Sequence, residues 1–114
     1  NDKGDNVSPQ RVEGMLTLQP EIAQAMVHGD RRPYLVALLV PEAEYAGKPD
    51  LQQKLSKAVD RVKADLSVIE RIRRFIVADE PFTTDNEQLT PSLKIRRHVI
   101  KTVYGERLDG LYGK

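Results

Sequence analysis

The sequence has no cysteine and no tryptophan, and its aromatic residues are two phenylalanines and four tyrosines. The absence of cysteine excludes a disulfide framework and thiol chemistry, and it fits a reducing compartment. The two histidines, His28 and His98, lie far apart in the sequence and lack the spacing of metal ligands, so we expect no metal site. No apolar run approaches the ~20 residues that a membrane-spanning helix needs, and no signal peptide is visible. We therefore expect a cytoplasmic protein, with peripheral association with a membrane left open.

The charges that are present are balanced. There are 18 basic and 17 acidic residues, for a net charge of +1, which argues against a protein built to bind nucleic acid. With 39% apolar and 31% charged residues, the 114-residue chain suits one domain with a modest core. The first residue is Asn1 and not Met, so we expect a piece of a larger protein or a processed product.

The order of the helical and strand patterns predicts the fold class. Ser8 as N-cap and Pro9 at the first helical position predict a helix that ends near Leu18. Strand patterns follow at Ile22–His28, Tyr34–Val40 and Ile72–Val77. The second of these is a continuous apolar run, which predicts a central strand covered on both faces. The order αββαβα indicates an α+β domain, in which helices cover a small antiparallel or mixed sheet of about three strands.

Apolar spacing predicts a second helix between the last two strands. Asp50 and Gln53 have the spacing of a capping box, and apolar residues at helical intervals continue to Leu66. The opposite side of this helix carries charges of both signs, which is typical of a solvated face.

The last part of the chain is expected to be helical. We predict a helix from about Ile95 to Tyr104, with Val99 and Val103 on its apolar side. Gly105 is expected to break this helix, and a short terminal helix is expected to follow the break.

The stretch L-T-P-S-L-K-I-R-R at residues 89–97 contains the principal candidate for a functional residue. Pro91 fixes its own φ and disfavours helix before it, so the stretch begins as a shaped loop, which Phe82 is expected to attach to the core. Lys94 lies where this loop enters the last helix. An ammonium held there can reach out of its own domain towards a phosphate or a carboxylate. The competing interpretation is a solvated lysine, since most lysines are exposed and unpaired.

The sequence contains no recognisable Ser/His/Asp or Cys/His arrangement, no P-loop and no dinucleotide-binding motif. It offers one placed cation, Lys94, a glycine loop around Gly4, and several arginines. Arg71, Arg73 and Arg74 flank the third strand, where they could bind phosphate or protect the strand edge against pairing. This set of residues suits the binding of an anion contributed by another domain. It does not suit a self-contained active site.

Four stretches of the chain resemble a known family. They are G-D-N-V-S-P-Q-R-V-E at Gly4–Glu13, the hairpin sequence at Met26–Pro41, F-T-T-D-N-E-Q-L-T-P-S-L-K-I-R-R at Phe82–Arg97, and the tail Ile100–Tyr112. Together they resemble the C-terminal domain of the adenylate-forming superfamily, and within it the AMP-forming long-chain fatty acyl-CoA synthetases. The superfamily usually has glycine directly before its conserved lysine. Here that residue is Leu93, which is similar to the bulkier residues common in the long-chain branch.

The resemblance implies that residues 1–114 are one mobile C-terminal domain of a larger synthetase, whose N-terminal adenylation core is absent from this sequence. Such an enzyme activates a fatty acid with ATP to give acyl-AMP, and then transfers the acyl group to CoA while the C-terminal domain rotates between the half-reactions. ATP, Mg²⁺ and CoA would be bound mainly by the N-terminal domain, which would be this chain's partner. The isolated domain is therefore expected to be inactive, and no nucleic acid is expected to bind.

The resemblance also assigns roles to particular residues. Lys94 would serve adenylate formation as the catalytic lysine. The loop containing Gly4, with Lys3 and Asn6 as its neighbours, would enter the site for thioester formation. The arginines that could contact phosphate are Arg96, Arg97 and the group at residues 71–74, although stabilisation of the folded surface is the alternative for each.

Two alternatives remain open. The chain could belong to another adenylate-forming enzyme, such as a fatty acyl-AMP ligase, a short-chain synthetase or a luciferase-like enzyme. It could also be a non-catalytic module that binds nucleic acid or anionic lipid through its arginines. The near-zero net charge and the small number of aromatic residues argue against the second alternative.

Overall fold

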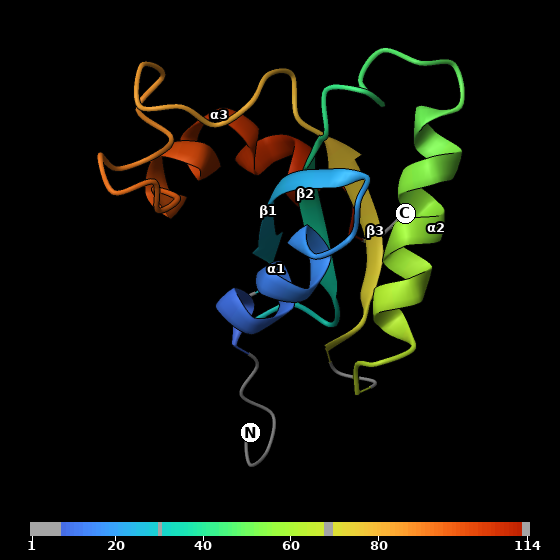
Figure 1. Ribbon diagram of the computed structural model, residues 1–114. Coiled ribbons are helices and arrows are strands. Elements are labelled where there is room, and N and C mark those ends of the chain that lie inside the picture. The colour runs from blue at the N-terminus through green and yellow to red at the C-terminus, as the bar shows by residue number, and fades with distance from the viewer. Residues whose placement is uncertain (1–7, 30, 68–69, 113–114) are drawn as a thin grey trace.

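The computed structural model describes residues 8–29, 31–67 and 70–112. Within these ranges the helices and strands follow the predicted order (Figure 1). They are α1 (Pro9–Thr17), β1 (Ile22–His28), β2 (Leu35–Pro41), α2 (Leu51–Lys63), β3 (Ile72–Val77) and α3 (Arg97–Asp109). The expected α+β class is confirmed.

The strands form one mixed sheet in the order β1-β2-β3. β1 and β2 make an antiparallel hairpin, in which Val27 lies opposite Ala37. β3 runs parallel to β2, with Ile76 opposite Leu38. Of the two predicted arrangements, the mixed sheet is therefore the one found. It is not antiparallel throughout, because α2 forms a crossover between β2 and β3 and brings the chain back in the same direction.

Two hydrophobic clusters lie on opposite faces of the sheet. α1 and α2 cover one face, where Leu16 and Leu55 are fully buried. α3 covers the other face, where Phe82 and Tyr104 join side chains from β2. β2 contributes alternate residues to the two clusters, so the prediction of a central strand covered on both faces is confirmed.

The predicted start of α1 is confirmed, and that of α2 is partly wrong. Ser8 caps α1, because its Oγ accepts a hydrogen bond from the backbone N–H of Arg11 at 3.3 Å. Asp50 does occupy the N-cap position of α2, but its side chain makes no capping hydrogen bond. Its backbone is turned (φ −99°, ψ 16°) and not extended, so the capping box with Gln53 does not form.

α3 differs from the prediction in its start, its length and its buried face. It begins at Arg97 and continues through Gly105 to Asp109, so the predicted break is wrong. An isolated glycine costs a helix only about 1 kcal/mol, which the packing of α3 offsets. The buried residues are Ile100, Tyr104 and Leu108, whereas Val103 is 56% exposed. Ile95 belongs to the preceding loop. The buried side of the helix therefore begins at Ile100, one residue after the predicted Val99.

Candidate functional site

The residues around Lys94 form a closed loop ahead of α3. We refer to residues 89–95 as the Lys94 loop. Its two ends pair as an antiparallel bridge between Leu89 and Ile95. Just outside the bridge, the backbone N–H of Arg96 donates to the carbonyl of Gln88 at 2.8 Å. The loop therefore leaves and re-enters the body of the domain at one fixed place.

Hydrogen bonds inside the loop fix the backbone at its tip. The N–H of Thr90 donates to the carbonyl of Lys94 at 2.8 Å, and the Thr90 hydroxyl accepts from the N–H of Lys94 at 3.1 Å. The N–H of Leu93 donates to the carbonyl of Thr90 at 2.8 Å. The turn begun at Pro91 is thus a hydrogen-bonded structure that holds the backbone of Lys94.

Leu93, directly before Lys94, has a backbone conformation that suits glycine. Its φ is +68°, in the left-handed region where a side chain is strained. Its side chain is 70% exposed, so packing within the described residues offsets little of this strain. The glycine that the superfamily usually has at this position is explained by this conformation.

Residues 82–88, which we refer to as the supporting segment, lie beneath the Lys94 loop. The side chain of Phe82 is 2% exposed and packs in the α3 cluster, as predicted. The amide of Gln24 on β1 exchanges two hydrogen bonds with the Phe82 backbone, at 2.9 and 3.0 Å. Asn86 Oδ1 accepts from the backbone N–H groups of Thr83 and Gln88, each at 3.0 Å. The segment is therefore anchored both to the core and to the sheet.

Lys94 and the two arginines after it lie in different surroundings. The Lys94 side chain is exposed and makes no ion pair or hydrogen bond with any residue that the structure describes. Arg96 Nη1 donates to the carbonyl of Glu87 at 3.3 Å. Arg97 makes two hydrogen bonds to the carboxylate of Glu13, at 2.7 and 2.8 Å. Both candidate phosphate contacts thus have acceptors within this domain, which favours the structural alternative for them.

Sequence reasoning did not identify Glu13 as a partner of Arg97. Glu13 lies in α1 and is only 8% exposed. It follows Val12 and precedes Leu16, both fully buried, so a carboxylate on the apolar side of the helix was the available signal.

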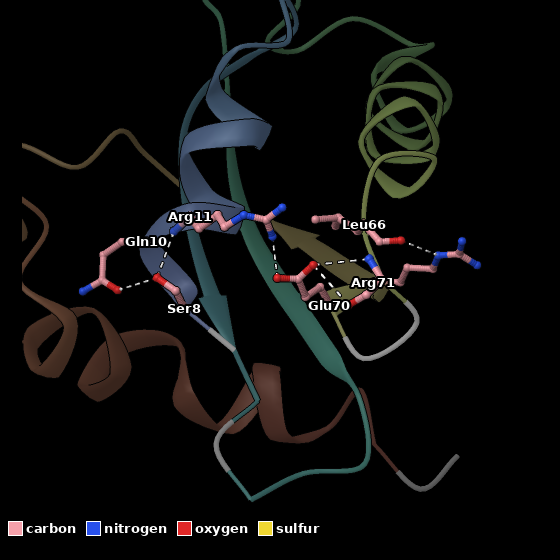
Figure 2. Close-up of polar contacts among 7 residues, drawn as sticks. Ser8, Gln10, Arg11, Leu66, Glu70 and Arg71 are labelled. Atoms are coloured by element: carbon pink, nitrogen blue, oxygen red, sulfur yellow. Dashed lines mark hydrogen bonds and ion pairs between the residues drawn. The ribbon is translucent and has the colours of Figure 1, made fainter. Parts of the chain in front are cut away.

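The predicted thioester-forming residues Lys3, Gly4 and Asn6 lie outside the described residues. The structure does describe the start of the helix that follows them. Arg11 makes an ion pair with Glu70, just ahead of β3, and Figure 2 shows this contact beside the Ser8 cap. The hydrogen bond from Arg11 lowers the pKa of Glu70 below its usual value. The first turn of α1 is therefore tied to the rest of the domain.

The arginines at residues 71–74 lie at the opposite edge of the sheet from Arg97, which contacts β1. Arg71 Nε donates to the carbonyl of Leu66 at 3.3 Å (Figure 2), and Arg73 lies over the ring of Tyr34. A hollow of about 260 Å³ is lined by Lys63, Arg71, Ile72 and Arg73. The structure does not bring this basic group together with Lys94.

Within residues 8–29, 31–67 and 70–112, no group of acidic, histidine or cysteine side chains could hold a metal ion. None of the helices found there combines the length and the apolar character that crossing a bilayer requires.

Comparison with known proteins identifies the family. The model of the AMP-binding enzyme C-terminal domain matches residues 2–114. The chain therefore belongs to this family, and the resemblance found in the sequence is confirmed. It is 32% identical to the long-chain-fatty-acid–CoA ligase FadD15 of Mycobacterium tuberculosis, over 97% of this chain and 22% of that enzyme. It is 26% identical to long-chain-fatty-acid–CoA ligase 1 of Cavia porcellus, over 96% of this chain and 19% of that enzyme.

Solved structures of related enzymes share the fold. The adenylation domain of a carboxylate reductase from Mycobacterium chelonae matches with a TM-score of 0.84 and 35% identity, over 95% of this chain and 18% of that one. An acyl-CoA synthetase from Brucella canis matches with a TM-score of 0.61 and 26% identity, over 89% of this chain and 18% of that one. The chain thus spans about a fifth of the length of the relatives that it matches.

Proposed function

We propose that this chain is the mobile C-terminal domain of a long-chain fatty acid–CoA ligase. In the complete enzyme, a fatty acid and ATP would give acyl-AMP and pyrophosphate, and CoA would then displace AMP to give the thioester. The domain would rotate between these half-reactions. The family membership and the similarity to long-chain-fatty-acid–CoA ligases support this proposal.

The observation that carries the proposal is an exposed lysine on a hydrogen-bonded loop. Two anions, the fatty acid carboxylate and the α-phosphate of ATP, must approach each other in adenylate formation. Negative charge also accumulates at the α-phosphate as the adenylyl group transfers and pyrophosphate leaves, so a cation held in place stabilises the transition state. The Lys94 ammonium is available for this role, because it has no partner among the described residues. An arginine would not be equivalent, since its planar guanidinium is not a compact point charge.

The segment containing Gly4 would serve the second half-reaction. After the rotation Lys94 would lie away from the reacting atoms, and the Gly4 loop, with Lys3 and Asn6, would line the path of the CoA thiol. A glycine permits the close backbone approach that this role requires. α1 follows this loop directly and is anchored by Ser8 and Arg11, which would carry the loop with the domain.

The remaining groups of the site would belong to an N-terminal domain. That domain would provide the ATP and Mg²⁺ sites and the fatty acid tunnel, and it would contribute most of the CoA site. The 114-residue chain alone is therefore expected to bind ATP and CoA weakly or undetectably and to catalyse neither step. Tight binding of ATP by this chain in calorimetry would contradict the division of labour. Peripheral association with a membrane would be a property of the complete enzyme.

The adenylation step tests this proposal. In the full-length enzyme, Lys94→Ala is expected to lower fatty-acid-dependent ATP–pyrophosphate exchange by roughly 10²–10³-fold, the loss typical of one electrostatic donor. Lys57→Ala is the matched control, because Lys57 is an exposed lysine on α2. Equal exchange rates in the two variants would remove Lys94 from the mechanism.

A second candidate function differs from the first in the molecule that accepts the acyl group. The chain is 31% identical to a long-chain-fatty-acid–[acyl-carrier-protein] ligase of Arabidopsis thaliana. This relative supports, as the second candidate, an adenylate-forming enzyme that transfers the acyl group to a carrier protein. Single-turnover transfer from acyl-AMP to CoA and to an acyl-carrier protein, measured side by side, distinguishes the two acceptors.

A further inference from the structure

Glu13 is a charged residue on the core-facing side of α1. Its Oε2 accepts hydrogen bonds from the backbone N–H of Val27 and from Arg97 Nη1, each at 2.7 Å. Its Oε1 accepts from Arg97 Nη2 at 2.8 Å. Two such bonds between one carboxylate and one guanidinium fix the orientation of the arginine as well as its position. Arg97 Nη1 also lies 3.4 Å from the carbonyl of Val27, so the β1 backbone contributes to the same arrangement.

Arg97 is the first residue of α3, and Lys94 lies three positions before it. The backbone between them is held at each step. Ile95 pairs with Leu89, and the N–H of Arg96 donates to Gln88. Little conformational freedom therefore remains between Arg97 and Lys94. A displacement of the Arg97 side chain would be transmitted to the Lys94 loop.

Stability alone does not account for an ion pair whose carboxylate is 10% exposed and whose arginine is 28% exposed. Removal of a carboxylate from water costs several kcal/mol, and well-packed apolar residues often stabilise a protein as much or more. An apolar pair cannot fix an orientation in the same way. Here the β1 backbone holds Glu13, and Glu13 holds Arg97 at two points. The arrangement is thus suited to placing the start of α3.

We propose that Glu13 and Arg97 are positioning residues, which set where the Lys94 ammonium is presented during adenylate formation. This inference rests on the proposed function, because it assigns Lys94 to that half-reaction. Neither residue contacts a substrate in this scheme. Both act through the backbone of the Lys94 loop, and they link that loop to α1.

A second ion pair with a buried carboxylate provides a control in the same domain. Glu21 is 7% exposed and accepts a hydrogen bond from Arg61 Nη2 at 2.5 Å. Burial by itself would raise the pKa of Glu21, but the hydrogen bond and charge of Arg61 outweigh it and lower the pKa. This pair joins the residue before β1 to α2 and makes no contact with the Lys94 loop. The Glu13 and Glu21 side chains are equally exposed, at 10%, but Arg61 is 47% exposed against 28% for Arg97, so the control matches the carboxylates and not the arginines.

The test compares conservative variants of the two pairs in the full-length enzyme. Arg97→Lys keeps the charge but loses the two-point contact, and Glu13→Gln keeps the acceptor for Val27 but loses the charge. For each variant, the burst of pyrophosphate with a fatty acid and ATP-Mg²⁺ measures adenylation, and conversion of pre-made acyl-AMP to acyl-CoA measures transfer. We expect adenylation to fall roughly 10–100-fold, as for a misplaced catalytic group, with transfer nearly unchanged. Arg61→Lys is expected to change neither step.

The double variant Glu13→Gln/Lys94→Ala separates positioning from general destabilisation. If Glu13 acts through Lys94, the added substitution lowers adenylation no further than Lys94→Ala alone. An equal fold-loss in both backgrounds would overturn the inference, as would a parallel loss of both half-reactions in Arg97→Lys and Glu13→Gln. If either single variant fails to fold, the other still tests the inference. Normal adenylation by Lys94→Ala alone would instead show that the proposed function of Lys94 is wrong.

Discussion

The Lys94 loop and the supporting segment differ in the burial and the hydrogen bonding of their side chains. In the supporting segment, Phe82 and Gln88 are each 2% exposed, and backbone and side-chain hydrogen bonds link the segment to β1. In the Lys94 loop, Leu93 is 70% exposed and Lys94 has no side-chain partner among the described residues. Figure 1 shows that the chain between β3 and α3 extends well beyond the sheet.

This difference is what would let Lys94 act as a placed cation. Here the side chain is free and its backbone is held, so the ammonium can be delivered to another domain from a defined point. We therefore expect substitutions in the supporting residues to affect folding, and substitutions at the tip to affect chemistry.

The largest effect on stability is expected from Phe82→Ala. Removal of a fully buried phenylalanine typically costs about 3–5 kcal/mol, because the cavity left behind does not collapse completely. Urea unfolding of the 114-residue chain, followed by circular dichroism, measures this loss. Leu18→Ala is the control, since Leu18 is 81% exposed. A similar small change in both variants would show that Phe82 does not anchor the segment.

A smaller loss is expected from Arg97→Met. This substitution leaves the Glu13 carboxylate buried without its cation, which costs about 3 kcal/mol. Arg107→Met is the control, because Arg107 pairs with Asp79 where both side chains are about half exposed or more, at 48% and 67%. Exposed pairs contribute at most about 1 kcal/mol. Equal unfolding free energies for the two variants would show that the Glu13–Arg97 pair stabilises the domain no more than the exposed Asp79–Arg107 pair does.

The alkaline limit of stability is expected to depend on Tyr112. Its hydroxyl donates to the carbonyl of Tyr34 at 2.8 Å, with the carbonyl of His28 3.2 Å away, and burial raises its pKa to about 12. A pKa raised above the unfolded value means that the folded state favours the neutral phenol. The stabilisation is fully present below pH 10 and is lost as the pH rises towards 12. Its size is about 1–2 kcal/mol, because solvent screens part of the effect.

Unfolding of the 114-residue chain at several pH values between 9 and about 12 measures this dependence. Tyr112→Phe should lose stability at pH 9, because the Tyr34 carbonyl loses its donor, but it should show a weaker decline above pH 10. The same decline in both proteins would assign the alkaline transition to another group.

The smallest effect on stability is expected at the tip of the Lys94 loop. Leu93→Gly should stabilise the chain by up to about 1 kcal/mol, because relief of the positive φ outweighs the entropy of glycine. Leu18→Gly should destabilise it by about 0.5–1 kcal/mol, because Leu18 has a helical backbone with φ −75°. The same sign for both substitutions would show that Leu93 is not strained.

Much of the fold follows from local sequence patterns. The apolar run of β2 and the helical spacing of α2 predicted their burial, and Phe82 was predicted to reach the core. The parallel pairing of β3 and the start of α3 at Arg97 were not predictable in this way. Both depend on contacts between distant segments, namely the crossover through α2 and the bridge that takes Ile95 into the loop.

Only part of the candidate site could be predicted from the sequence. Lys94 was found through its motif, since an isolated loop lysine has no distinguishing chemistry. Leu93 was interpreted from the sequence only as typical of the long-chain branch, and its positive φ became visible in the structure. The pairing of Glu13 with Arg97 joins residues at opposite ends of the chain, so only the folded structure reveals it.

We propose that Lys94 serves adenylate formation and not acyl transfer. The most direct test of this role is single-turnover transfer from pre-made acyl-AMP to CoA by the full-length Lys94→Ala enzyme. We expect a transfer rate close to that of the unmodified enzyme, alongside the loss of roughly 10²–10³-fold in adenylation. A transfer rate reduced by the same factor as adenylation would contradict this role of Lys94.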